Sequence, residues 1–317
     1  MHLLQLLRIG NLIIIAIAQV LLGVAVVGPL LRSYGIEVTN LPLLFLLLII
    51  TTIAFAAGGY IINDYYDRET DRINTNRRIP IEIVGIGKAI RWYGALTTGG
   101  IFSTLYLALL TKSIALGLIL TGIPVLLWLY SRYLKPTLLT GNLLVALISA
   151  FSIFLTGWIT ILHLQAEFGP ALDSTRIPDE IYTTTGFFAL FAFLLTLVRE
   201  IAKDAEDIPG DTACDCRTLP IVAGLKVTKT AILLLITSTV ALLSYFTGFI
   251  HPFNTLQSVA YLITFTVVPL AYTAYQTVKA SEPSHFKKTS FLLKVSMITG
   301  IAYALIFYSQ FANHPNQ

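Results

Sequence analysis

The sequence has few charged residues and few cysteines. Charged side chains make up 12% of its 317 residues, whereas hydrophobic ones make up 56%. A soluble globular domain carries about a quarter charged residues, so this composition excludes an ordinary soluble domain and predicts a polytopic membrane protein. The two cysteines, Cys214 and Cys216, are too few and too close together for a disulfide framework, and we expect two free thiols.

Several common functional motifs are also missing. The sequence contains no Walker loop, no G-x-G-x-x-G, no H-E-x-x-H and no nucleic-acid-binding module. The five histidines are scattered, so they do not complete the four-ligand set of a structural zinc site around the two cysteines. The first apolar run is too long for a cleavable signal sequence. We therefore expect no nucleic-acid partner and no zinc site.

Long apolar runs are abundant. A helix of about 20 apolar residues crosses a bilayer. The sequence predicts nine such spans, at residues 9–31, 42–62, 92–111, 113–131, 141–163, 180–199, 228–250, 255–276 and 289–311. We expect an all-α polytopic membrane protein whose single domain covers residues 1–317.

The distribution of Lys and Arg predicts the orientation in the membrane. With the N-terminus in the cytoplasm, all of the 21 Lys and Arg except Arg32, Lys112 and Arg176 fall in cytoplasmic segments. Cytoplasmic loops of membrane proteins are enriched in these residues. We therefore predict a multi-pass protein of the cell membrane, with its N-terminus inside and its C-terminus outside.

Two acidic stretches follow the second and the sixth predicted spans. In each, three aspartates are spaced three and then four residues apart: Asp64, Asp67 and Asp71, then Asp204, Asp207 and Asp211. This spacing returns to one face of a helix, and clustered carboxylates suit Mg²⁺. Charge runs are commonly solvated loops, but the repetition at two matching places favours a metal site. Pro209 predicts a helix break that leaves Asp211 in a loop, while Asp71 stays helical.

Basic residues accompany these acids at the predicted cytoplasmic ends of the spans: Arg68, Arg72, Arg77, Arg78, Arg132, Lys135, Arg199 and Lys203. Mg²⁺ is commonly held by carboxylates together with substrate phosphates, which suggests a Mg²⁺-bound diphosphate on a lipid tail. Departure of diphosphate from an allylic carbon leaves a carbocation. The metal would stabilise the leaving group, and apolar surroundings would keep water from the cation.

Four polar residues near these ends have two interpretations each. Asn11 and Asn142 lie early in the first and fifth spans, where they could face the metal and diphosphate or form interhelical hydrogen bonds. Tyr130 and Lys135 follow the fourth span, where they could bind phosphate oxygens or mark the cytoplasmic end of a helix.

The chain resembles the UbiA superfamily of intramembrane prenyltransferases in two motifs, Asn63-Asp64-x-x-Asp67-x-x-x-Asp71 and Arg199-Glu200-x-x-Lys203-Asp204-x-Glu206-Asp207-x-x-Gly210-Asp211. Shorter matches are Arg8-x-x-Asn11, Tyr130-Ser-x-x-x-Lys135 and Arg217-Thr218-Leu219-Pro220-Ile221. The resemblance implies nine helices around a central cavity that opens sideways to lipid under a cytoplasmic cap.

The resemblance also implies residue roles. The six aspartates would gather Mg²⁺ and the prenyl diphosphate, with Asp64, Asp67, Asp204 and Asp207 as the catalytic residues. The substrate-binding residues would be Asn11, Asn63, Arg68, Arg77, Tyr130, Lys135 and Lys203.

The acceptor has alternatives. The second motif looks most like that of geranylgeranylglycerol-phosphate geranylgeranyltransferases, in which a glycerol hydroxyl attacks the allylic cation and forms an ether lipid. An aromatic acceptor of quinone biosynthesis, of the hydroxybenzoate, naphthoate or homogentisate type, is the second reading. A cation-coupled transporter is a remote third, disfavoured because the acids lie at helix ends rather than at the membrane midplane. The loop after the first motif also departs from many relatives, since Glu82 replaces a small residue.

Overall fold

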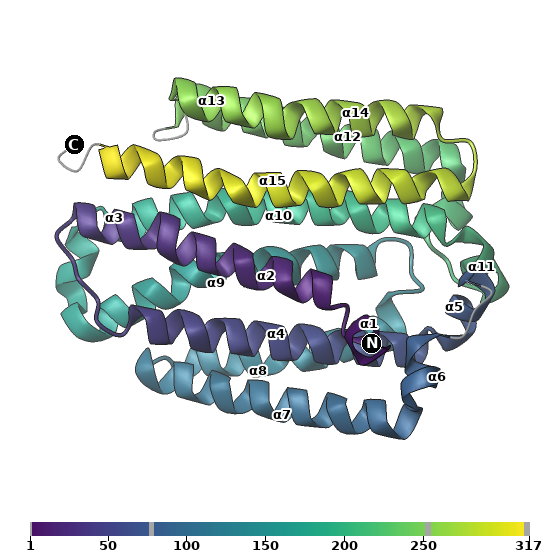
Figure 1. Cartoon of the computed structure of the whole chain (residues 1–317), viewed down its shortest axis with the longest axis horizontal. Coiled ribbons are helices and arrows are strands. Elements are labelled where there is room, and N and C mark those ends of the chain that lie inside the picture. The colour runs from purple at the N-terminus through teal and green to yellow at the C-terminus, as the bar shows by residue number, and fades with distance from the viewer. Residues whose placement is uncertain (1, 76–78, 251–254, 314–317) are drawn as a thin grey trace. The chain divides into compact units, whose positions relative to one another are not determined.

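The computed structural model describes residues 2–75, 79–250 and 255–313, and these residues are helical with short connections (Figure 1). Within these ranges, nine helical segments are long and apolar enough to cross a membrane: Ile9–Ser33, Leu41–Tyr66, Ile86–Leu110, Ile114–Leu134, Thr140–Ser174, Ile177–Glu206, Leu219–Phe249, Leu256–Lys279 and Pro283–Gln310. The prediction of an all-α polytopic membrane protein is confirmed, and the nine helical segments are candidates for the nine predicted spans.

Several helices extend beyond the predicted spans. The third span begins at Ile86 rather than at residue 92, the sixth runs on to Glu206, and the seventh begins at Leu219. The added turns of the third and sixth spans carry charged residues, such as Arg91 and Lys203, and the helix continues where the hydropathic run ends. The seventh segment is broken at Gly224, whose φ of 79° and ψ of 165° are not helical, so residues 219–223 form a separate turn before the body of the span.

The chain divides into two compact units, residues Met1–Leu134 with Phe151–Gly186 and residues Lys135–Ala150 with Phe187–Gln317. The first unit contains eight complete helices and parts of two others. The complete ones are α1 (His2–Leu6), α2 (Ile9–Leu21), α3 (Gly28–Ser33), α4 (Leu41–Tyr66), α5 (Arg68–Thr75), α6 (Pro80–Val84), α7 (Ile86–Leu110) and α8 (Ile114–Leu129). The division falls within α9 (Thr140–Phe168) and α10 (Ile177–Glu206).

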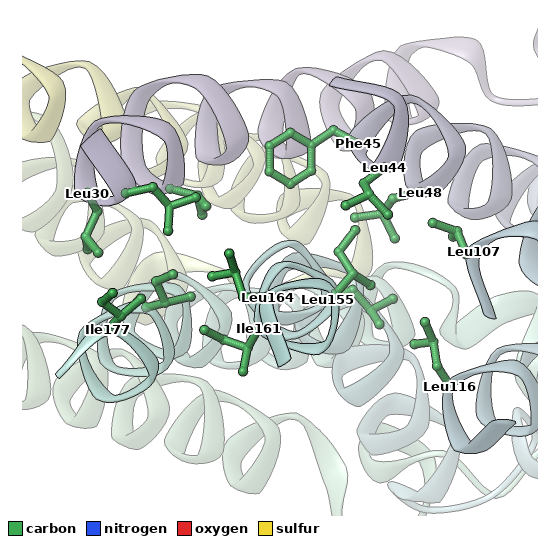
Figure 2. Close-up of a cluster of buried hydrophobic side chains, with 14 of the residues drawn as sticks. Leu30, Leu44, Phe45, Leu48, Leu107, Leu116, Leu155, Ile161, Leu164 and Ile177 are labelled. Carbon is green, nitrogen blue, oxygen red and sulfur yellow. The ribbon is translucent and has the colours of Figure 1, made fainter. Parts of the chain in front are cut away.

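The core of the first unit is built from leucine and isoleucine. Helices α4 and α7 run side by side (Figure 1). Figure 2 shows the main cluster, in which Leu44 and Leu48 of α4 lie with Leu107 of α7, Leu116 of α8 and Leu155 of α9. All five side chains are almost completely buried. Lipid tails are as apolar as leucine, so this cluster holds the spans together by close van der Waals packing rather than by removal of the side chains from water.

A polar contact crosses the same unit. Gln19 of α2 is fully buried; its Nε2 donates to the carbonyl of Ser152 on α9 at 2.9 Å, and its Oε1 accepts from Thr52 Oγ1 on α4 at 2.8 Å. Both ends of the amide are therefore satisfied inside the unit. Such interhelical hydrogen bonds are worth about 0.6–2 kcal/mol between membrane helices.

The second unit holds the remaining helices: α11 (Ile208–Ala213), α12 (Leu219–Phe249), α13 (Leu256–Leu262), α14 (Val268–Lys279) and α15 (Phe286–Asn313). Its main cluster joins Val198 of α10 with Ile232 of α12, Leu270 of α14 and Leu293 of α15. The C-terminal half of α10 thus shares one hydrophobic core with the last three spans.

Three spans contain a wider π-helical turn, at Leu22–Val27, Tyr130–Leu134 and Ile263–Val267. Short π-helical turns inside α-helices are frequent at functional sites. The second of them begins with Tyr130, which the sequence nominates as a substrate-binding residue.

Candidate active site

The first acidic motif is formed by two helices that meet at its middle aspartate. Asp67 lies between α4 and α5 with φ −83° and ψ 3°, outside both helices. Helical hydrogen bonds nevertheless continue past it, from Asp67 N–H to the Asn63 carbonyl at 2.9 Å and from Asp71 N–H to the Asp67 carbonyl at 2.8 Å. Asp71 lies in α5, so the prediction that it stays helical is confirmed.

The second motif has the same backbone pattern. Asp207 lies between α10 and α11 with φ −89° and ψ 5°. Its N–H donates to the Lys203 carbonyl at 2.8 Å, and the N–H of Asp211 donates to the Asp207 carbonyl at 3.0 Å. The prediction that Asp211 lies in a loop is wrong, because Asp211 belongs to α11. Pro209 is tolerated there since it lies in the first turn, where a helix has no use for its missing N–H.

Asp64, at the end of α4, is paired with a cation from the N-terminus. Nη2 of Arg8 donates to Oδ1 of Asp64 at 2.7 Å, and the Asp64 side chain is 8% exposed. The Arg8 guanidinium also lies over the ring of Tyr60, 5.1 Å from its centroid. Burial alone would lower the pKa of Arg8, but the charges of Asp64 and its neighbours raise it, so Arg8 stays protonated. Arg8 adopts a left-handed conformation between α1 and α2, which turns the chain there.

Asn63 and Asp67 form a buried pair on one side of the motif. Nδ2 of Asn63 donates to Oδ2 of Asp67 at 2.6 Å, and both side chains are buried. Oδ1 of Asn63 is buried too and has no hydrogen-bond partner in the described part of the chain. A buried carbonyl oxygen without a donor is costly, which makes it a natural ligand for a cation.

The other predicted substrate-binding residues of the first unit are less concentrated. Arg68, the first residue of α5, turns back onto the end of α4: its Nε donates to the Tyr65 carbonyl at 2.8 Å, and its guanidinium lies 4.6 Å from the centre of the Tyr65 ring. Asn11 lies in the first turn of α2, and its N–H donates to the Arg8 carbonyl at 2.7 Å. Tyr130 is half-buried in its π-helical turn. Arg77 lies outside the described residues.

An ion pair connects the segment after the first motif to the motif itself. Arg72 of α5 pairs with Glu82 of α6. Glu82 is the residue at which we expect this loop to depart from the family pattern. In this chain it therefore takes part in connecting α5 to α6.

Asp204 of the second motif has a partner on another helix. Nδ2 of Asn142, near the start of α9, donates to Oδ2 of Asp204 at 2.7 Å, and Asn142 is 5% exposed. Lys135 lies near enough to interact electrostatically with Asp204. Oγ1 of Thr218 donates weakly to Oδ2 of Asp211 at 3.4 Å. Asn142 thus forms an interhelical hydrogen bond, and it forms that bond with a predicted metal ligand.

Lys203 is engaged with a carboxylate that the metal prediction omitted. Its Nζ donates to both oxygens of Glu200, at 2.9 and 3.0 Å. Nη1 of Arg199 donates to Oε1 of the same carboxylate at 3.1 Å. Glu200 is 9% exposed, so two cations hold one buried carboxylate near the end of α10.

Two of these side-chain pairs could not be predicted from the sequence. Arg8 is 56 residues from Asp64, and Asn142 is 62 residues from Asp204. No local pattern connects residues so far apart. The sequence signals were that each is a polar residue at the edge of an apolar span and that Arg8 belongs to the Arg8-x-x-Asn11 match; neither signal names the partner.

The donors suit a hard divalent cation such as Mg²⁺. Of the residues described, no three His, Cys, Asp or Glu side chains form a ready group around one metal position. Mg²⁺ needs few protein ligands, because it keeps several waters and is commonly bound by one or two carboxylates and the substrate's phosphates. Asp64, Asp67 and the unpartnered oxygen of Asn63 supply oxygen donors only, the preference of a hard cation.

The fold and the site define an all-helical membrane protein with an aspartate motif at the end of α4 and another at the end of α10. The model of the UbiA prenyltransferase family matches residues 12–298. The chain belongs to this family of enzymes, and the transporter reading is set aside.

Among curated relatives, the digeranylgeranylglyceryl phosphate synthase of Saccharolobus solfataricus is 32% identical over 308 residues, covering 95% of each chain. That of Sulfurisphaera tokodaii is 34% identical over 77% of this chain and 78% of its own.

Two solved structures share the fold. One, from a study of digeranylgeranylglyceryl phosphate synthase in membranes, has a TM-score of 0.62 at 22% identity and covers 96% of this chain and 98% of its own. The apo structure of a UbiA homologue from Aeropyrum pernix K1 has a TM-score of 0.59 at 17% identity, covering 92% of this chain and 96% of its own.

Proposed function

We propose that this enzyme transfers a geranylgeranyl group from its diphosphate to geranylgeranylglycerol phosphate, forming an ether lipid and releasing diphosphate. The observation that carries the proposal is the similarity of almost the whole chain to a digeranylgeranylglyceryl phosphate synthase, at 32% identity. Its chemistry rests on the oxygen donors around Asp64 and Asp67 and on the cations beside them.

In this proposal the ligands of Mg²⁺ are the six aspartates of the two motifs, namely Asp64, Asp67, Asp71, Asp204, Asp207 and Asp211. Asn63 adds its free carbonyl oxygen. Bound Mg²⁺ would neutralise the charge that develops on the departing diphosphate. The residues that bind and orient the diphosphate are Asn11, Arg68, Arg77, Tyr130, Lys135 and Lys203.

The transfer balances without a redox partner. The bond between the allylic carbon and the diphosphate oxygen breaks, and the pair of electrons leaves with the diphosphate. A hydroxyl oxygen of the glycerol acceptor bonds to the allylic carbon and loses its proton. Apolar side chains around the prenyl chain would keep water from competing for the cation.

The proposal includes a membrane arrangement. The chain acts as one domain with its N-terminus in the cytoplasm, its C-terminus outside, and a central cavity whose cap and active site face the cytoplasm. Support comes from the bias of Lys and Arg. Cys214 and Cys216 are the only two cysteines and follow α11 directly. A membrane-impermeant maleimide should label them in inside-out vesicles and not in right-side-out ones; the reverse labelling would refute the orientation.

One assay tests the acceptor. Purified protein is incubated with geranylgeranyl diphosphate and Mg²⁺, with geranylgeranylglycerol phosphate in one tube and aromatic acids in others, and products are identified by mass. We expect a diether phosphate that disappears when EDTA is added. A prenylated aromatic product instead would keep the metal chemistry and refute the lipid acceptor.

A further inference from the structure

The first aspartate of each acidic motif has a different kind of hydrogen-bond donor. Asp64 accepts from a cation, since Nη2 of Arg8 donates to its Oδ1 at 2.7 Å. Asp204, the matching residue of the second motif, accepts from the neutral amide of Asn142 at 2.7 Å and interacts with Lys135 only electrostatically. The two motifs share one backbone pattern, so the guanidinium bound to Asp64 is a property of the first motif's own side chains.

Arg8 reaches Asp64 from an unusual backbone position. It lies between α1 and α2 with φ 48° and ψ 49°, a left-handed conformation that favours glycine. Leu6, two residues earlier, is fully buried in a cluster with Ile61 and Ile81, which fixes α1 against α4 and α6. Strained positions of this kind persist only where the surrounding structure holds them, and they gather at ligand-binding sites. The backbone strain therefore indicates that the Arg8 side chain has a use beyond filling the turn.

The described carboxylates that face Arg8 are two of the expected metal ligands. The guanidinium interacts electrostatically with Asp64 and Asp67, and it lies 5.1 Å from the centre of the Tyr60 ring; all of these residues belong to the first unit. Mg²⁺ binds carboxylate oxygens at about 2.1 Å, so a metal ion on Asp64 would lie beside the guanidinium. Two cations on one buried carboxylate repel each other, because little water screens them. Arg8 and the metal ion therefore compete for Asp64.

We propose that Arg8 makes metal binding at the first motif depend on diphosphate; this inference rests on the proposed function. Without diphosphate, a metal ion must displace the guanidinium from Asp64 or share the carboxylate with it. Diphosphate supplies negative charge and acceptor oxygens, so the guanidinium binds phosphate oxygens while the metal ion takes the carboxylate. The planar fork of an arginine suits both partners. The Arg8 side chain is 35% exposed, so it can turn from the carboxylate to a phosphate.

A coupling of this kind is reciprocal. If diphosphate strengthens metal binding by some factor, the metal ion strengthens diphosphate binding by the same factor. The first motif then holds its metal ion tightly only when a diphosphate is bound, and free metal ions leave Asp64 paired with Arg8. An ion pair that only fixed α1 to α4 would not produce this link, because it would be the same with and without diphosphate.

The test measures the binding of Mn²⁺, a probe for Mg²⁺, rather than turnover. Full-length protein in nanodiscs of zwitterionic lipid is titrated with Mn²⁺, with and without inorganic diphosphate, and bound Mn²⁺ is followed by electron paramagnetic resonance. Empty nanodiscs with the same additions give the background of the soluble Mn²⁺–diphosphate complex. Diphosphate should tighten Mn²⁺ binding to the wild type about tenfold or more.

The decisive variant is Arg8→Gln. Mn²⁺ alone should bind to it about tenfold more tightly than to the wild type, because the competing cation is gone, and diphosphate should add little. The second motif is the same in both proteins, so a difference between them reports the first motif. Partial unfolding cannot imitate this result, since it would weaken Mn²⁺ binding rather than tighten it.

Two controls accompany this variant. Arg91→Gln removes the same charge from the same unit at an exposed position of α7, and it should leave Mn²⁺ binding unchanged with and without diphosphate. Arg8→Lys keeps the charge without the fork. Mn²⁺ alone should bind to Arg8→Lys as weakly as to the wild type, and part of the response to diphosphate should return.

Two results would overturn the inference: Mn²⁺ alone binding to Arg8→Gln no more tightly than to the wild type, or Arg91→Gln producing the same tightening. The proposed function fails separately. If the acceptor assay yields no diether phosphate while Arg8→Gln tightens Mn²⁺ binding, the proposed acceptor is wrong and the coupling stands. If the diether is formed and Arg8→Gln leaves Mn²⁺ binding unchanged, the function stands and Arg8 is only a structural partner of Asp64.

Discussion

Replacing Asp64 by asparagine removes one negative charge and leaves the shape of the side chain nearly unchanged. In the structure, Oδ1 of Asp64 accepts from Arg8 at 2.7 Å. A pair of unit charges about 4 Å apart is worth about 4 kcal/mol at an effective dielectric constant of about 20. The Arg8 side chain is 35% exposed, so solvent screens the pair and we expect a loss of about 1 kcal/mol in the free energy of unfolding.

The expected loss of activity is much larger. Removing one preorganised electrostatic contact from a catalytic site costs about a hundredfold to a thousandfold in kcat. A loss of about 1 kcal/mol cannot produce this by unfolding, because folded proteins keep about 5–15 kcal/mol of stability. Asp64→Asn should therefore lower turnover at least a hundredfold and weaken Mn²⁺ binding about tenfold, while the protein stays folded.

Three measurements check this reasoning: prenyl transfer, Mn²⁺ binding by electron paramagnetic resonance, and thermal unfolding. Asp173→Asn is the matched control, since it makes the same change at an exposed position in the 3₁₀ turn Gly169–Ser174. It should leave turnover and metal binding unchanged. Asp64→Asn protein that kept more than about a tenth of wild-type turnover, or bound Mn²⁺ as tightly as the wild type, would refute the role of Asp64 as a metal ligand.

Three further predictions follow from single contacts. Asn142→Ala removes a 2.7 Å hydrogen bond to Asp204 and should lower turnover about tenfold in the prenyl-transfer assay. Unchanged turnover would show that this hydrogen bond has only a structural role. Gly157→Ala places a methyl group against the side chain of Thr185 on the neighbouring helix and should lower stability in thermal unfolding by about 1–3 kcal/mol. Gly122→Ala, whose added carbon has no described atom within 4 Å, should lower it by nothing. Equal effects of the two variants would contradict this packing. Burial and a hydrogen bond to Glu180 raise the pKa of Tyr34 to about 12. Tyr34→Phe should therefore lower the free energy of unfolding below pH 10, and this loss should vanish as the pH approaches 12. A difference in stability that does not depend on pH would contradict the prediction.

The repeat of the acidic motif was readable in the sequence because it is local. The spacing of Asp64, Asp67 and Asp71 predicts a helical face, and the backbone follows it through Asp67. Pro209 was misread since a proline in the first turn of a helix costs little, and the position of that turn depends on where α10 ends. The end of α10 was placed too early because hydropathy registers the apolar part of a helix and not its hydrogen bonds. The start of α12 at Leu219 was missed because a break at Gly224 separates it from the body of the span.

By itself the sequence determined the helical class, the nine apolar spans and the resemblance to prenyltransferases, because these depend on composition and on residues a few positions apart. Only the tertiary structure decided which side chains meet. Arg8 reaches Asp64, and Asn142 reaches Asp204, across 56 and 62 residues. Apolar packing beside each pair fixes the helices that carry it, through Leu6 and Ile61 near the first pair and through Ala146 and Ile201 near the second. No local sequence pattern contains that packing.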